Sequence, residues 1–179
     1  VELAQHPRQD LVALVLDALQ HGVPIGYDGD RKGPFPVPAN HTRPDHPSAD
    51  AITESIVKEV RDGTVLGPFV QVPNNVRTSP IGSVRKKGPD GSFTGWRKVV
   101  DLSHSLPGLP GVNAFVRVSS PEYARFDDAL DLVARLGPRT RIWKIDVDSA
   151  YRNIPVAPRD RLLLGFHWAG YYFIDCRTS

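Results

Sequence analysis

The chain has 179 residues and a formal net charge of +2, and this length is enough for one domain with an adequate core. It contains no apolar run that could span a bilayer, and its single Cys176 excludes an internal disulfide framework. Both features favour an intracellular protein without a membrane partner, in the cytoplasm or the nucleus.

The charge is unevenly distributed along the chain. Residues 1–76 carry 6 Lys and Arg against 10 Asp and Glu, whereas residues 77–179 carry 16 Lys and Arg against 10 Asp and Glu. The basic second part is expected to face phosphates, with ordinary surface solvation as the alternative.

The first half of the chain predicts two helices separated by an irregular connection. Apolar residues recur at helical spacing over residues 8–21, and Gly22 ends this run. Residues 22–47 are rich in Pro, Gly, Asp and His, which is typical of an extended, irregular segment. A second helix is predicted from about residue 49 to residue 62, with Ser48 as its N-cap.

The second half predicts antiparallel pairs, a third helix and one further strand. The expected elements are strands at 80–86 and 96–102 around a turn at 87–92, a helix at 122–136, a strand at 141–147, a short turn at 149–153, and a hairpin of residues 162–168 and 171–176. Three helices interrupted by antiparallel hairpins indicate an α+β fold and not a doubly wound parallel sheet.

The segment from residue 143 to residue 156 carries the clearest chemical signal. Asp146 ends a short apolar run, and the aromatic Tyr151 follows five positions later. A carboxylate at a strand end is a natural ligand for a hard cation, and an aromatic ring just beyond it can wall a pocket above that ion. From the residues alone, Asp146 could equally cap a neighbouring backbone group, and Tyr151 could be a core aromatic.

A series of ordered sequence blocks resembles a known family. The blocks are 63–69 (GTVLGPF), 79–87 (SPIGSVRKK), 96–103 (WRKVVDLS), 111–113 (GVN), 144–146 (KID), 150–156 (AYRNIPV) and 164–168 (LGFHW). Each is weak alone, but their order resembles the reverse transcriptases (RNA-directed DNA polymerases) of retrotransposons, and DIRS-like elements most of all. The resemblance implies a right-hand polymerase fold, of which this chain would supply the fingers and the N-terminal part of the palm.

The same resemblance divides the chain and sets its expected extent. It implies an N-terminal helix with an irregular linker at 1–47, a fingers-like region with a basic hairpin at 48–120, and the start of the palm at 121–179. The chain begins at Val1 and contains no Met, which indicates a piece of a longer reading frame. We therefore expect an incomplete polymerase that is inactive alone and that lacks the rest of the palm, the thumb and the ribonuclease H part.

The resemblance also implies roles for individual residues. Asp146 would be catalytic and would bind both Mg²⁺ ions, or Mn²⁺ in their place, with the backbone carbonyl of Val147 as a further ligand. Tyr151 would lie beneath the sugar of the incoming nucleotide and exclude a ribose 2′-hydroxyl. Lys86 and Arg97 would grip the triphosphate, as Arg does through its bidentate donors. On charge alone the basic hairpin could simply be solvated, and three adjacent cations leave open which of them contacts phosphate.

The implied reaction is two-metal addition of deoxynucleotides to a primer. Its partners would be an RNA template, a DNA primer and deoxynucleoside triphosphates. The alternative is a non-catalytic nucleic-acid-binding remnant of a mobile element. A plain α+β interaction domain with a basic face is disfavoured by the ordered blocks.

Other polar residues predict no site. The six histidines show no metal-ligand spacing, and the run Ser103-His104-Ser105 is not expected to be catalytic. Asp148 would share a face with Asp146 on a continued strand, but solvent exposure or a local hydrogen bond is its expected role.

Overall fold

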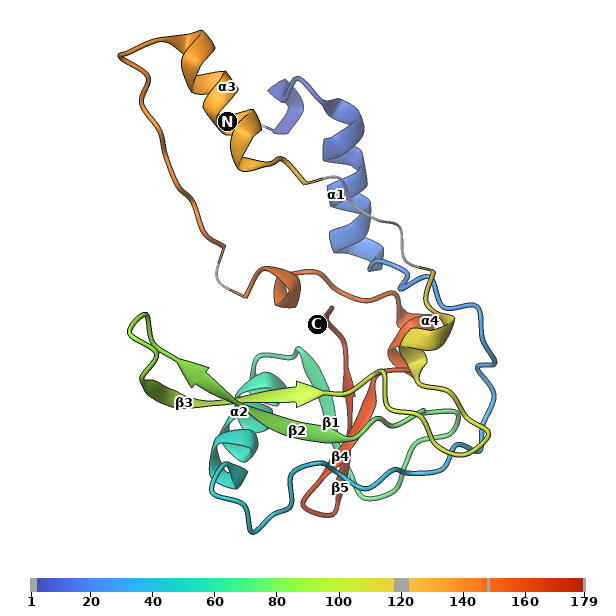
Figure 1. The fold of residues 1–179 in the computed structure, drawn as a ribbon. Coiled ribbons are helices and arrows are strands. Elements are labelled where there is room, and N and C mark those ends of the chain that lie inside the picture. Colours follow the sequence, from blue (N-terminus) through green and yellow to red (C-terminus); the bar gives the residue numbers. More distant parts are fainter. Residues whose placement is uncertain (1–2, 118–122, 148, 179) are drawn as a thin grey trace.

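The computed structural model describes residues 3–117, 123–147 and 149–178, and it confirms the α+β class (Figure 1). Five strands within these ranges form two antiparallel sheets. The first sheet has the order β1-β5-β4 and the second pairs β2 with β3. The strands are β1 (Val65–Phe69), β2 (Ile81–Lys87), β3 (Phe93–Val100), β4 (Gly165–Trp168) and β5 (Tyr171–Asp175).

All three predicted helices form, and the structure adds one short helix, α4. They are α1 (Gln9–His21), α2 (Ala49–Arg61), α3 (Phe126–Leu136) and α4 (Pro158–Arg161), with single 3-10 turns η1 (Leu3–Gln5), η2 (Val112–Phe115) and η3 (Ala150–Asn153). The third helix, predicted from residue 122, begins only at Phe126; residue 122 itself lies outside the described ranges, and residues 123–125 are not helical. None of the helices described is long and apolar enough to cross a membrane.

Both predicted hairpins form. β2 and β3 pair in a register that places Val84 opposite Arg97, and this register shifts between Lys86 and Lys87, as at a β-bulge. β4 and β5 are joined by a tight turn in which Ala169 and Gly170 both have positive φ, of 49° and 85°. Such turns match the right-handed twist of paired strands.

The hydrophobic core lies where α2 covers the two sheets. Its buried side chains are Ile52, Ile56, Val65, Ile81, Phe166, Trp168 and Phe173. The Phe166 and Phe173 rings stack with their centroids 5.3 Å apart. This cluster unites the first sheet, the β2–β3 hairpin and α2, because each contributes side chains to it.

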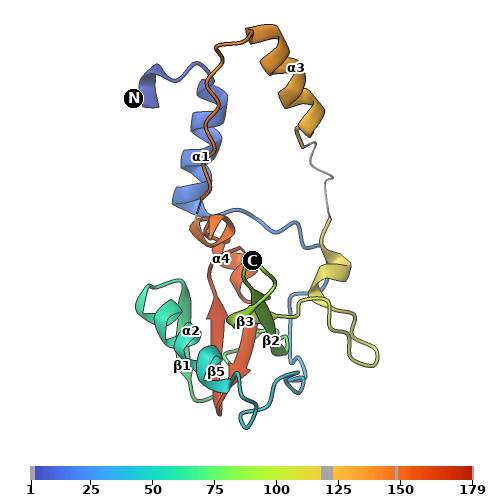
Figure 2. The same ribbon diagram turned by 60° about the vertical axis from the view of Figure 1, so that its left-hand side comes forward.

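The predicted strand at 141–147 is wrong. All seven residues are exposed and none is in a strand, and the apolar side chains of Ile142, Trp143 and Ile145 are 75%, 81% and 87% exposed. A short apolar run favours a strand, but a strand also needs a neighbour for its backbone N–H and C=O groups. In both views α1, α3 and the chain after α3 extend away from the sheets on the same side (Figures 1 and 2).

The stacked Phe166 is expected to be a principal source of stability. Phe166→Ala should lower the free energy of unfolding by about 3–5 kcal/mol, because it removes a fully buried ring and leaves a cavity. Urea denaturation followed by circular dichroism measures this loss. Tyr171→Ala is the matched control, because Tyr171 belongs to the same hairpin but is 46% exposed. An equal loss in the two variants would contradict the assigned core.

Candidate functional site

A pocket of about 470 Å³ lies between β3 and η3 and brings together residues from distant parts of the chain. It is lined by Glu59, Arg97, Lys98, Val99, Val100, Ser149, Ala150, Tyr151, Arg152 and Asp175. Two residues that the sequence singled out, Arg97 and Tyr151, therefore line one cavity although 54 positions separate them in the sequence.

The β2–β3 register places Lys86 on the same face of the hairpin as Arg97. Lys86 pairs with Gly95, two residues before Arg97, so the two cations are diagonal neighbours on one face. Arg85 pairs with Trp96 on the opposite face, and its guanidinium lies 4.9 Å from the centroid of the Phe93 ring. Of these two adjacent cations, Lys86 is therefore the one that shares a face with Arg97.

Backbone hydrogen bonds fix the position of Tyr151. The chain that follows it runs beside the end of β5, where Val156 N–H donates to the Cys176 carbonyl at 2.9 Å and Thr178 N–H donates to the Ile154 carbonyl at 3.1 Å. The Thr178 hydroxyl also donates to the Tyr151 carbonyl oxygen. The Tyr151 side chain remains 65% exposed, so its ring is open to a ligand.

The predicted metal ligands come just before Ser149, which lines the pocket, but they do not line it themselves. Asp146 and Val147 belong to the exposed segment ahead of η3, and neither lines the cavity. Asp148, expected to be exposed or locally hydrogen-bonded, lies outside the described residues. At Ser149 the chain adopts a left-handed conformation, with φ 50° and ψ 43°, and then enters η3.

An ion network among residues that line the pocket was not predicted from the sequence. Lys98 pairs with Glu59, whose other oxygen lies 3.6 Å from Arg152, and Arg152 also pairs with Asp175. The Lys98 ammonium lies 4.5 Å from the centroid of the Phe166 ring, and its side chain is only 6% exposed. The network therefore ties α2, β3, η3 and β5 together.

One sequence signal could have located part of this network. Side chains alternate along a strand, so Lys98 must face opposite to its exposed neighbour Arg97 and toward the core. A lysine directed inward requires a carboxylate partner. Nothing in the local pattern, however, shows that this partner is Glu59, or that Arg152 reaches the same carboxylate.

The electrostatics of the pocket separate its cations into two groups. Within the described part of the chain, Lys98 and Arg152 are neutralised by carboxylates, whereas no ion pair engages Arg97. Burial raises the pKa of the Asp175 carboxyl above its ordinary value, although the positive charge of Arg152 lowers it in part. Arg97 is thus the cation available to an anionic ligand.

The fold is similar to that of a viral reverse transcriptase. The crystal structure of native prototype foamy virus protease–reverse transcriptase aligns with 99% of this chain at 17% identity and a TM-score of 0.53. A mutant of the same protein gives a TM-score of 0.55 at 17% identity over 99% of this chain. The foamy viral enzyme in complex with double-stranded DNA gives 0.53 at 17% identity, again over 99% of this chain.

These neighbours are much longer than this chain. The chain spans 23% of the native and mutant foamy virus chains, and 36% of the chain in the DNA complex. No protein-family model matches the sequence, and no curated protein matches it. The likeness establishes a reverse-transcriptase-like fold.

Removal of Arg152 should destabilise the protein in a pH-dependent way. Arg152→Met leaves the mostly buried carboxylates of Glu59 and Asp175 without this partner, and should cost about 2–3 kcal/mol of unfolding free energy at neutral pH. The pKa of Asp175 should rise further than in the unaltered protein. A carboxyl whose pKa is higher in the folded state than in the unfolded state destabilises the folded protein when it is ionised. The loss of unfolding free energy in the variant should therefore shrink as the pH falls toward about 4, the ordinary pKa of an unfolded-state carboxyl.

Two measurements test this expectation. Urea unfolding between pH 4 and 7 gives the loss of unfolding free energy in the Arg152 variant. Carbon-detected NMR of the Asp175 carboxyl gives its titration midpoint. Lys58→Met is the control, since it breaks the exposed Lys58–Asp62 pair and should cost about 0.5 kcal/mol or less. A loss in the Arg152 variant that is equal at all pH values would contradict the assigned network.

Proposed function

We propose that this chain forms part of an RNA-directed DNA polymerase and that the pocket between β3 and η3 receives the incoming deoxynucleoside triphosphate. The observation that carries the proposal is that Arg97 and Tyr151 line one cavity on a reverse-transcriptase-like fold. A phosphate-binding cation and an exposed aromatic ring in one pocket match the two ends of a nucleotide. The sequence blocks favour a DIRS-like retrotransposon as the source, with fingers at 48–120 and the start of the palm at 121–179.

Arg97 and Lys86 would bind the triphosphate. Arg97 is exposed and outside the ion network, and its planar guanidinium can donate two parallel hydrogen bonds to phosphate oxygens. Lys86, on the same face of the hairpin, would add a second positive charge farther along the phosphate chain. The neutralised Lys98 and Arg152 would hold the pocket in shape without contacting the nucleotide.

Tyr151 would contact the sugar. Its ring is exposed at the pocket wall, while hydrogen bonds to the chain after β5 fix its backbone. A ring beneath the sugar would clash with a 2′-hydroxyl and would therefore favour deoxynucleotides. The basic hairpin and the second half of the chain, which has excess positive charge, would also face the template and primer backbones.

The donor atoms near η3 fit a hard divalent cation. The Asp146 carboxylate and the Val147 carbonyl offer only oxygen, which Mg²⁺ prefers and Mn²⁺ accepts, and both residues are exposed. Bound there, the metal would neutralise the triphosphate and activate the primer 3′-hydroxyl. Asp146 would be the catalytic carboxylate of this chain.

Nucleotide binding should depend on one face of the hairpin. In the presence of Mg²⁺ and a primer–template duplex, Arg97→Ala and Lys86→Ala should each weaken binding of a fluorescent deoxynucleoside triphosphate by about tenfold or more, because each removes a charge-assisted contact. Fluorescence anisotropy measures the dissociation constant. Arg85→Ala is the matched control, since it removes the same charge from the opposite face.

Two results would count against the proposal. An equal loss in the Arg85 and Lys86 variants would mean that general charge attracts the nucleotide. Duplex binding by the unaltered chain with no saturable nucleotide binding would support the non-catalytic nucleic-acid-binding alternative instead.

The role of Tyr151 can be tested through the sugar. Tyr151→Ala should reduce the preference for deoxynucleoside over ribonucleoside triphosphates, because the ring that meets the 2′-hydroxyl is gone. Tyr151→Phe keeps the ring and should retain the preference. Competition of each nucleotide against the fluorescent probe gives the ratio of affinities. The same preference in the Ala variant and the unaltered protein would show that Tyr151 does not contact the sugar.

A further inference from the structure

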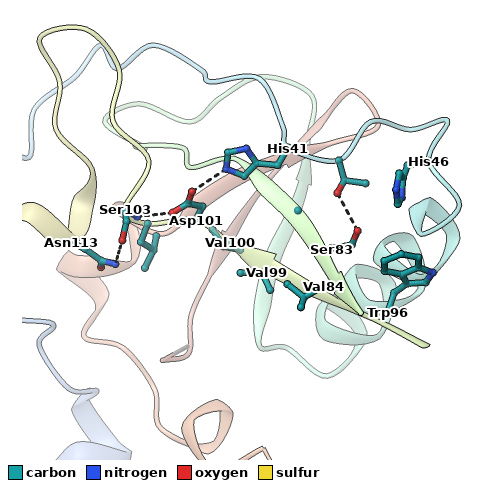
Figure 3. A pocket seen from close by; sticks show the side chains of 13 residues that line it. His41, His46, Ser83, Val84, Trp96, Val99, Val100, Asp101, Ser103 and Asn113 are labelled. Carbon is teal, nitrogen blue, oxygen red and sulfur yellow. Dashed lines mark hydrogen bonds and ion pairs between the residues drawn. The ribbon is translucent and has the colours of Figure 1, made fainter. Parts of the chain in front are cut away.

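A second group of side chains, all of types that can bind a metal ion, lies at the end of β3 beside a cavity of about 620 Å³. His41, Asp101 and His104 each offer one ligand atom, and these atoms lie within 4.8 Å of one another. Figure 3 shows His41 directed at Asp101, with His41 Nε2 and Asp101 Oδ2 2.9 Å apart. The side chains come from segments 60 residues apart, which is why histidine spacing did not reveal them.

The backbone holds all three residues in place. Asp101 and His104 bracket a turn in which the His104 N–H donates to the Asp101 carbonyl at 3.3 Å. The Ser103 N–H donates to Asp101 Oδ1 at 3.0 Å, which leaves the other carboxylate oxygen directed at His41. His41 is held through its main chain, since its backbone N–H donates to the Ile81 carbonyl at 3.0 Å.

We propose that His41, Asp101 and His104 form a binding site for a transition-metal cation of the Zn²⁺ type. Two imidazoles and one carboxylate are donors that suit Zn²⁺ and neighbouring metals, whereas Mg²⁺ prefers oxygen alone. The two imidazole rings meet edge to face, with centroids 5.3 Å apart and an interplanar angle of 75°. Their nitrogens can therefore approach a common point by small side-chain rotations.

The geometry is close to what such an ion requires. Zinc binds His nitrogen and carboxylate oxygen at about 2.0–2.2 Å, which sets neighbouring ligand atoms about 3.3 Å apart. The His41–Asp101 pair is already near this separation, so His104 is the residue that must move closer. Three protein ligands leave a fourth position for water or another molecule from the adjoining cavity.

A bound cation would connect two segments that otherwise meet through a few hydrogen bonds. His41 lies in the irregular stretch ahead of α2, and Asp101 and His104 lie just after β3. Binding that occurs only when these segments are together stabilises the folded state, and this stabilisation grows with the logarithm of the metal concentration above the dissociation constant. This site is distinct from the oxygen donors at Asp146 and does not depend on the proposed polymerase function.

The chain offers a matched control for this site. His21 Nδ1 and Asp17 Oδ1 in α1 also lie 2.9 Å apart and form an exposed histidine–carboxylate pair. Within the described ranges, this pair is not part of any cluster of three ligand-type side chains. A surface histidine paired with a carboxylate should bind zinc far more weakly than a complete site.

The experiment is a titration of the untagged chain with Zn²⁺, followed by calorimetry, and with Co²⁺, followed by visible absorption. We expect one equivalent of metal, and Co²⁺ bands typical of four-coordinate nitrogen and oxygen ligation. His104→Gln and Asp101→Asn should each weaken Zn²⁺ binding by about tenfold or more, since even outer partners of metal ligands contribute that much. His21→Gln should bind as the unaltered chain does, and Mg²⁺ in excess should not compete.

Several results would overturn the proposal. If the unaltered chain does not bind Zn²⁺ saturably, the proposal fails whatever the variants show. It also fails if a thiolate-to-cobalt absorption band appears, which would place the metal on Cys176. An affinity unchanged in His104→Gln, or reduced equally in His21→Gln, would show that the metal binds elsewhere.

Discussion

The ion network of Glu59, Lys98, Arg152 and Asp175 is the interaction on which the rest of the structure depends. Each member belongs to a different element, so the network fixes α2, β3, η3 and β5 with respect to one another. Their side chains are at most 25% exposed, and such charges are tolerated only when they are paired. The pocket with Arg97 and Tyr151 exists because this network holds η3 against β3.

The network and the hydrophobic core support the same hairpin from two sides. A two-stranded sheet is marginal by itself, so β2 and β3 need cover on one face. Ile81 supplies part of that cover within the core, and Lys98 supplies more through its contact with Phe166 and its pair with Glu59. The opposite face is then free to present Lys86 and Arg97. Stability and ligand access are thus divided between the two faces of one hairpin.

Local sequence pattern was enough for the elements that are stabilised locally. Helices α1 to α3 and both hairpins follow from apolar spacing, end signals and turn residues. β1 was not predicted, because its Gly67 and Pro68 lack strand propensity and its pairing depends on the distant β5. The same limit explains the error at 141–147, where a short apolar run favours a strand but no strand of the described ranges pairs with it. For the candidate site, the sequence singled out Arg97 and Tyr151, which line one cavity. The pairing of Arg152 with Asp175 and of His41 with Asp101 requires the folded chain.

The exposed segment 141–147 should also affect how the protein behaves in concentrated solution. A run of large, exposed apolar residues outside any strand is the kind of sequence that stacks on identical copies of itself. In-register stacking would bring each Asp146 beside another Asp146 and each Lys144 beside another Lys144, and like charges oppose that arrangement. These two residues would therefore oppose aggregation through this segment. The carboxylate proposed for catalysis would then also help to keep its own segment soluble.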